Sequence, residues 1–149
     1  MGLVSWLPCH PPISTALPSA DLLYIGALAD VAAVALHAIE QVPDGIGGKR
    51  VVVIGDGPIG VMTAMLASFQ GAKVELVGRH PHVEGHLPLG TTFRHVGANS
   101  TTDDANICIE AVGREQADTL TLGIQRARPK GSVIVLGVYR PTYVMPLPR

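Results

Sequence analysis

The sequence predicts an α/β domain of the doubly wound type, in which helices cover both faces of a parallel sheet. Residues 51–54 are four β-branched residues in a row, which is typical of a strand buried on both faces. A helical pattern and a second apolar strand at residues 73–77 follow, and the alternation of strand and helix continues to Leu136. We therefore expect a single domain with strand order 3-2-1-4-5, and residues 143–145 are a candidate sixth strand at the edge.

The remaining elements are predicted in chain order from apolar periodicity and from glycine and proline positions. A helix is expected at residues 58–70, because Pro58 suits a first helical turn and Gly71 ends the pattern. Residues 78–104 contain only a short candidate strand and no helical run. The later predicted elements are a strand at 105–112, a helix at 115–127 and a strand at 132–136, and the short candidate strand lies at 92–96.

The composition supports a folded domain and excludes some classes of function. Of the 149 residues, 47% are hydrophobic and 15% are charged, which excludes a disordered tail. The net charge of -1 comes without a basic stripe, so we expect no nucleic-acid partner. Cys9 and Cys108 lie far apart and outside any metal-binding spacing, which favours a reduced protein in the cytoplasm.

The N-terminal part of the chain divides into two segments. Residues 1–20 are interpreted as an extended strap, and residues 21–149 as the domain, because four prolines interrupt the strap and argue against a signal peptide. Residues 22–39 are apolar, but Asp30 near their centre would cost about 2.5 to 3.5 kcal/mol in a membrane. We expect no membrane span there, and instead a helix with both faces covered. It would pack against the following domain or, in addition, against something that this chain lacks.

A glycine-rich loop follows the first strand and opens the next helix. Its sequence, residues 55–60, is a G-x-G-x-x-G pattern, which in this context aims backbone N–H groups and the positive helix end at a diphosphate. The first glycine allows a tight turn, the second lets a pyrophosphate approach, and the third lets the helix pack close to the strand. The alternative is a plain strand-to-helix turn. The predicted cofactor-binding residues of this loop are Gly55, Gly57, Pro58, Ile59 and Gly60.

The residues after the second strand bear on which dinucleotide is bound. An acidic residue there would accept the ribose hydroxyls of NAD, but this sequence has Gly78, Arg79 and His80. The forked donor of Arg79 suits a 2′-phosphate, and a protonated His80 would assist it. The sequence therefore favours NADP over NAD, unless Arg79 is simply a solvated loop residue.

Several segments together resemble the cofactor-binding domain of the medium-chain, zinc-type alcohol dehydrogenase superfamily. The resemblance covers about residues 20–139 and rests on the entering helix, on the glycine loop with its strand, and on the ends of the last two strands. It implies a Rossmann fold that binds a nicotinamide dinucleotide at the carboxyl ends of the strands. On this basis the predicted cofactor-binding residues also include Ala111, Val112, Gly113, Gly137, Val138 and Tyr139.

Some features of that family are missing from this sequence. Full members have a catalytic domain that holds most zinc ligands and the substrate pocket, so we assign no catalytic residue and expect no zinc. Asp30 matches the position of one ligand, but a zinc site needs about three. His80, His82 and His86 are interpreted as solvated loop residues, and Cys108 as a small core side chain. The segment between residues 95 and 104 is shorter than in the family. This predicts that the part of the cofactor site that holds the adenine is distorted.

Three functions remain open on sequence grounds. The first is the cofactor half of an oxidoreductase that moves hydride between NADP(H) and a carbonyl, alcohol or enone, with a catalytic domain supplied by a partner. The second is a stand-alone dinucleotide-binding module without catalytic activity. The third is a structural homodimer, joined through the apolar helix at residues 22–39 and the edge strand at 143–145, with a vestigial nucleotide site.

Overall fold

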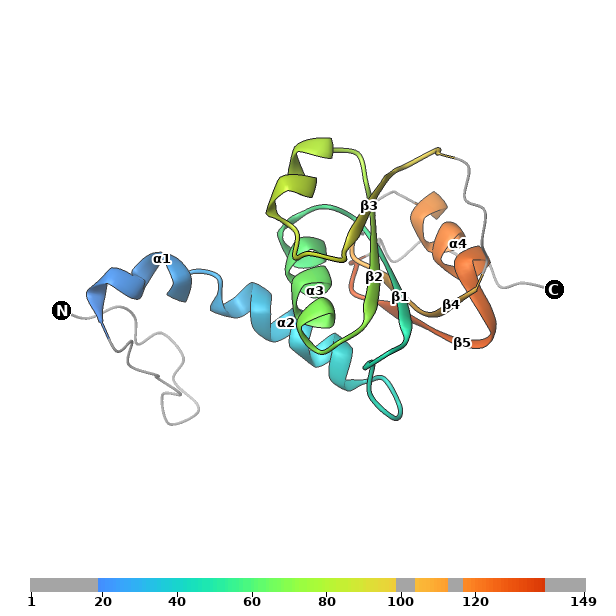
Figure 1. Ribbon diagram of the computed structural model, residues 1–149, viewed down its shortest axis with the longest axis horizontal. Helices are drawn as coiled ribbons and strands as arrows, with labels where there is room; N and C mark the ends of the chain where they lie inside the picture. The colour runs from blue at the N-terminus through green and yellow to red at the C-terminus, as the bar shows by residue number, and fades with distance from the viewer. Residues whose placement is uncertain (1–18, 99–103, 113–116, 139–149) are drawn as a thin grey trace.

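The strands form one parallel sheet with the order β3-β2-β1-β4-β5, which confirms the predicted topology (Figure 1). The computed structural model describes residues 19–98, 104–112 and 117–138. The candidate strand at 143–145 and residues 1–18 of the predicted strap lie outside these ranges. The strands are β1 (Arg50–Ile54), β2 (Lys73–Gly78), β3 (Thr92–His95), β4 (Ala105–Glu110) and β5 (Ala127–Val135). The helices are η1 (Ala20–Leu22), α1 (Leu23–Gly26), α2 (Ala29–Glu40), α3 (Pro58–Phe69), η2 (Pro81–His86) and α4 (Ala117–Arg126), of which η1 and η2 are 3-10 helices.

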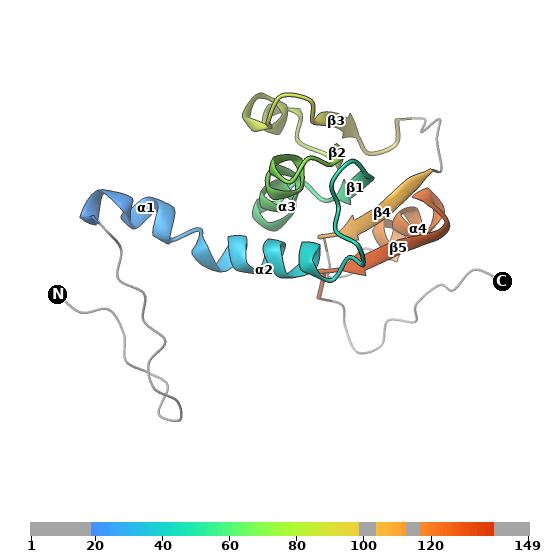
Figure 2. The same cartoon turned by 60° about the horizontal axis from the view of Figure 1, so that its bottom comes forward.

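Helices α2 and α3 lie on one side of the sheet and α4 on the other (Figure 2). The central strand β1 pairs with β2 and β4, so it has no free edge. Its side chains alternate between two cores: Val51 and Val53 join the core beneath α2 and α3, while Val52 and Ile54 join the core beneath α4. This two-sided burial is what a continuous β-branched run predicts.

The apolar segment at residues 22–39 differs from its prediction. It forms two helices, α1 and α2, and only Ala35, Ala38 and Ile39 in the second are buried. Tyr24 is 89% exposed and Ile25 is 64% exposed, because the helices extend beyond the edge of the sheet, as Figure 1 shows. The expected packing against the domain is therefore wrong for the first half of the segment, and its coverage by something outside this chain stays a prediction. None of the described helices is long and apolar enough to cross a membrane.

Two further differences from the prediction concern the start of β5 and residues 81–86. β5 begins at Ala127 instead of residue 132, because Ala127 already pairs with Ala105. The register then jumps to Ile107 with Ser132, and Lys130 within the irregularity has a φ of 65°. The region at 81–86, where no helix was expected, forms the 3-10 helix η2 and contributes Val83 to the core.

A buried carboxylate in β2, that of Glu75, forms ion pairs with three arginines from different elements. Glu75 Oε1 accepts hydrogen bonds from Arg94 Nε at 2.8 Å and from Arg126 Nη2 at 3.0 Å. Arg50 Nη2 lies 3.4 Å from Glu75 Oε2. Glu75 alternates with Val74 and Leu76, which face α3, so its side chain lies on the face that α4 covers. The arginine group thus links β1, β2, β3 and the end of α4.

The Glu75 group predicts how stability depends on pH. Burial raises the pKa of Glu75, but hydrogen bonds and charge from Arg94 and Arg126 lower it by more, so the folded-state pKa lies below its ordinary value of 4.5. The stabilisation is therefore fully present above about pH 4.5 and is lost as the pH falls through the folded-state pKa. We expect urea titrations at stepped pH to show a falling free energy of unfolding in this range, with a shallower fall in Glu75→Gln. An identical slope in the variant would contradict this assignment.

Candidate functional site

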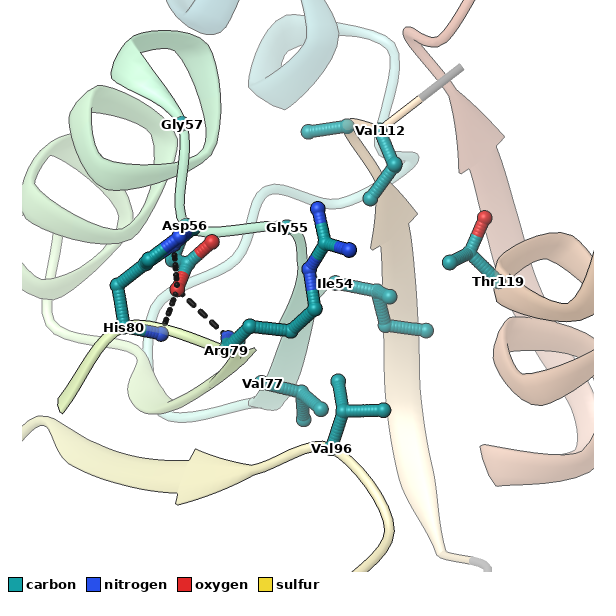
Figure 3. A pocket seen from close by; sticks show the side chains of 12 residues that line it. Ile54, Gly55, Asp56, Gly57, Val77, Arg79, His80, Val96, Val112 and Thr119 are labelled. Atoms are coloured by element: carbon teal, nitrogen blue, oxygen red, sulfur yellow. Dashed lines mark hydrogen bonds and ion pairs between the residues drawn. The ribbon is translucent and has the colours of Figure 1, made fainter. Parts of the chain in front are cut away.

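The carboxyl ends of β1, β2 and β4 surround a cavity of about 310 Å³ (Figure 3). The chain leaves β1 toward β2 on one side, while β4 lies on the other, so the cavity is at the point where the strand order reverses. Open α/β sheets bind their ligands at this point. The cavity is lined by Ile54, Gly55, Asp56, Gly57, Val77, Gly78, Arg79, His80, Val96, Ala111, Val112 and Thr119.

The three glycines of the loop have different surroundings. Gly55 has a φ of 114°, and a Cβ there would lie 2.8 Å from Val112 Cγ2. A Cβ on Gly60 would overlap the carbonyl group of Gly55, so this glycine is required for α3 to lie against β1. A Cβ on Gly57 would meet nothing within 4 Å. The fold therefore needs glycine at positions 55 and 60, whereas the absence of a side chain at Gly57 leaves open space at the cavity.

The amino end of α3 borders this open space. Gly57 is the N-cap residue, with φ -75° and ψ 176°, and no side chain caps the helix. Pro58 follows in the first turn, and Val61 donates to the Gly57 carbonyl at 2.9 Å. Pro58, Ile59 and Gly60 form this turn and do not line the cavity. An uncapped helix start with aligned backbone amides is suited to an anion such as a diphosphate.

A carboxylate from the glycine loop lies at the end of β2, where the sequence places none. Asp56 Oδ2 accepts the backbone N–H groups of Arg79 at 2.7 Å and His80 at 2.6 Å, and it lies 3.0 Å from His80 Nδ1. A Cβ on Gly78 would collide with the Asp56 side chain. Burial raises the pKa of Asp56, but hydrogen bonds from His80 and Arg79 outweigh it and hold the pKa below its ordinary value. Asp56 is therefore an anion at neutral pH.

The side chain of Arg79 projects over the cavity, toward Gly55 and Val112 (Figure 3). Asp56 accepts the backbone N–H of Arg79, and its carboxylate forms no ion pair with the guanidinium. Within the described ranges, the ion pairs of the other arginines involve Glu75 and Asp104, and Arg79 joins none of them. The geometry leaves the guanidinium of Arg79 facing the space in which an anionic ligand would lie.

The wall of the cavity on the side of β4 is formed by the residues at the end of that strand and the start of α4. Glu110 is fully buried, and its Oε1 accepts the Val112 N–H at 3.0 Å and the Thr119 hydroxyl at 2.9 Å. The Ala111 N–H donates to the Ile54 carbonyl at 2.8 Å. These bonds fix residues 111–112 beside the glycine loop and join them to the start of α4.

The structure brings half of the predicted cofactor residues to one cavity. Gly55, Gly57, Gly78, Arg79, His80, Ala111 and Val112 line it. Gly137 and Val138 follow β5 and are not among its lining residues, while Gly113 and Tyr139 lie outside the described ranges. The lining residues that sequence reasoning missed are Ile54, Asp56, Val77, Val96 and Thr119. The signal for Asp56 was its place inside the glycine motif, but its contact with residues 79–80 depends on how β1 and β2 pair.

The other candidate residues have ordinary surroundings. Cys108 is fully buried, and burial raises the pKa of its thiol to about 12, which confirms that it is a core side chain. The rings of His80 and His82 are 5.8 Å apart. Asp30 is exposed on α2. Among the residues that the structure describes, no three His, Cys, Asp or Glu side chains are grouped closely enough to hold a metal ion.

Comparisons with known proteins agree with the observed fold. No protein-family model matches the chain. Glucose 1-dehydrogenase from Thermoproteus tenax is 30% identical over 99 residues, which cover 63% of this chain and 28% of that protein. The alcohol dehydrogenase TADH from Thermus sp. ATN1 has a TM-score of 0.68 and 31% identity, covering 79% of this chain and 37% of that one. S. aureus TarJ in complex with NADPH has a TM-score of 0.67 and 24% identity, and the match covers 76% of this chain and 38% of that one.

The covered shares show how much of these proteins is matched. This chain spans about 28% of the curated relative and less than two fifths of the two solved structures. The chain is therefore similar, in fold and in sequence, to the cofactor-binding Rossmann domain of the medium-chain, zinc-type alcohol dehydrogenase superfamily.

Proposed function

We propose that this chain is the dinucleotide-binding part of a medium-chain oxidoreductase, acting in the cytoplasm, and that it favours NADP(H). The observation that carries the proposal is the open space at Gly57, set between a closed turn at Gly55 and a close helix contact at Gly60. A diphosphate in this space would meet the uncapped start of α3 without a side chain in its way. When bound, the nicotinamide supplies the hydride chemistry, and the residues of this chain hold and orient the dinucleotide.

Arg79 supports the preference for NADP(H). Its guanidinium faces the cavity at the end of β2, where the adenosine ribose of a dinucleotide lies in this fold. The Asp56 carboxylate opposes a 2′-phosphate there, but its Oδ2 is already engaged by N–H groups of Arg79 and His80. S. aureus TarJ, which shares the fold, binds NADPH in its solved structure.

Hydride transfer would require a second domain in this proposal. The dehydrogenases that the chain resembles are more than twice as long as it is. The substrate, a carbonyl, alcohol or enone, would bind against that domain. The exposed apolar residues of α1 and α2, among them Leu23, Tyr24 and Ile25, offer a surface for such a contact.

The same surface favours a second candidate function, a structural homodimer without dinucleotide binding. Sedimentation of the purified chain distinguishes the two. A dimer that persists when Gly57 is replaced, together with no dinucleotide binding by the original chain, would favour the structural role.

Calorimetric titration with NADPH and with NADH tests the proposed function. We expect saturable binding, a loss of affinity of at least about 100-fold in Gly57→Val because the new side chain fills the diphosphate space, and unchanged folding by circular dichroism. Gly85→Val is the matched control, since a Cβ on Gly85 also meets nothing within 4 Å and Gly85 lies outside the cavity.

The titrations also test the phosphate preference. Arg79→Ala should weaken NADPH binding by about 10-fold or more and leave NADH binding nearly unchanged, since a hydrogen bond to a charged group contributes roughly 1.5 to 3 kcal/mol. Equal losses for both dinucleotides would contradict the NADP preference. A chain that binds neither dinucleotide would contradict the function itself.

A further inference from the structure

We propose that Asp56 is a positioning residue that sets the choice between NADP(H) and NAD(H), by holding the turn at residues 79–80 so that Arg79 is presented to the 2′-phosphate. The inference rests on the proposed function. It assigns a role to the variable residue between the first two glycines of the loop, whose side chain points away from the diphosphate space and toward the end of β2 (Figure 3).

The contacts of Asp56 are concentrated on one short segment. A single oxygen, Oδ2, is 2.7 Å from the Arg79 backbone nitrogen, 2.6 Å from the His80 backbone nitrogen and 3.0 Å from His80 Nδ1. The side chain of Asp56 is only 9% exposed, although Arg79 and His80 are exposed. A buried carboxylate that accepts consecutive backbone amides restricts the backbone between them. The root of the Arg79 side chain is thereby fixed, while its tip stays open to the cavity.

Gly78 completes this arrangement. The Asp56 side chain occupies the place that a Cβ on Gly78 would need, so the loop after β1 packs directly on the last residue of β2. This contact requires both a small residue at position 78 and a carboxylate of aspartate length at position 56.

The arrangement has a consequence for recognition. The backbone amides of Arg79 and His80 are directed to Asp56, so a 2′-phosphate at this end must be bound by side chains, and Arg79 is the cation over the cavity. A dinucleotide without the 2′-phosphate does not use this guanidinium in the same way. Loss of the Asp56 contacts should therefore weaken NADPH binding more than NADH binding, even though it removes a negative charge from the cavity.

Three variants separate positioning from charge. In Asp56→Ala we expect the ratio of NADPH to NADH affinity to fall about 10-fold. In Asp56→Asn the amide oxygen still accepts backbone N–H groups without the charge, so the ratio should be retained. Gly78→Ala should reproduce Asp56→Ala, because its Cβ displaces the carboxylate. Asp30→Ala, at an exposed aspartate of α2, and Gly85→Ala, at an open glycine, are the matched controls.

A double variant tests whether Asp56 acts through Arg79. Adding Arg79→Ala to Asp56→Ala should lower the NADPH affinity little further, since the two residues act as one unit. Independent, additive losses would overturn the proposal. So would a rise in NADPH affinity in both Asp56 variants, which would show that the carboxylate only repels the phosphate, or equal losses for NADPH and NADH.

A measurement without ligand keeps this inference distinct from the proposed function. Amide hydrogen exchange at Arg79 and His80 should be protected in the original chain and in Asp56→Asn, and should accelerate in Asp56→Ala. Unchanged exchange would overturn the positioning role even if NADPH binds well. If the exchange changes as expected but the original chain binds neither dinucleotide, the proposed function fails, and the role in cofactor choice is overturned with it.

Discussion

Replacing Glu75 with alanine is expected to lower the free energy of unfolding by about 3 to 5 kcal/mol, the usual cost of removing one partner of a buried ion pair. The guanidinium of Arg126 is only 3% exposed and donates to Glu75 at 3.0 Å, so it would be left buried without that carboxylate. Arg94 and Arg50 are about one third exposed, so water would solvate them after the loss of Glu75, and they would contribute less to the destabilisation. Urea unfolding at neutral pH measures the change.

Two control variants show whether the loss comes from the stranded charge. Glu84→Ala removes an exposed glutamate of η2 and should change the free energy of unfolding by less than about 0.5 kcal/mol. The double variant Glu75→Leu with Arg126→Met replaces the pair by apolar side chains and should recover much of the loss. A loss below about 1 kcal/mol in Glu75→Ala would show that water reaches Arg126 and that the group contributes little.

Gly60→Ala is expected to destabilise the fold by about 3 kcal/mol, at the upper end of the range for overpacking. The added methyl group would overlap the carbonyl carbon and oxygen of Gly55. Both are backbone atoms, and they cannot rotate away as a side chain would. The Gly55 N–H also donates a hydrogen bond of 2.8 Å to the Val77 carbonyl, which holds this part of the backbone in place. Helix α3 would have to move off β1, which opens the core around Ala64 and Ala67.

Gly57→Ala is the matched control for this second prediction, because its Cβ would meet nothing within 4 Å in the same loop. Its free energy of unfolding should stay within about 1 kcal/mol of the original chain, or rise slightly, since alanine restricts the unfolded chain more than glycine does. Thermal and urea unfolding of both variants give the comparison. Similar losses in the two variants would mean that the loop is strained as a whole and that Gly60 has no special contact.

The topology and the location of the cavity follow from local features of the sequence. A β-branched run such as residues 51–54 favours a strand buried on both faces, and its position directly before a glycine loop and a helix indicates a parallel β-α-β unit. The strand order is the usual one for a doubly wound sheet, and the cavity beside Gly55 and Gly57 lies where that order reverses. These features depend on residues that are close in the chain, so they can be predicted without tertiary contacts.

The burial of the apolar segment at residues 22–39 could not be predicted in this way. Periodicity shows which residues share a helical face, but it does not show how far the sheet extends beneath that face. Ala35 and Ile39 lie over the sheet and are buried, whereas Tyr24 and Ile25 extend past it and are exposed. The extent of a surface is a property of the whole fold.

What the sequence determined by itself was the Rossmann topology and the diphosphate loop, since strand burial and glycine geometry are local consequences of residue type. Only the tertiary structure decided that Asp56 accepts the backbone N–H groups of residues 79–80. The same is true of the hydrogen bond from Arg126 to Glu75, which lies 51 residues away in the chain. Both contacts depend on which strands are neighbours and in which register they pair. A one-residue change of register would turn Glu75 to the opposite face of the sheet, so these charges find their partners only after the sheet has formed.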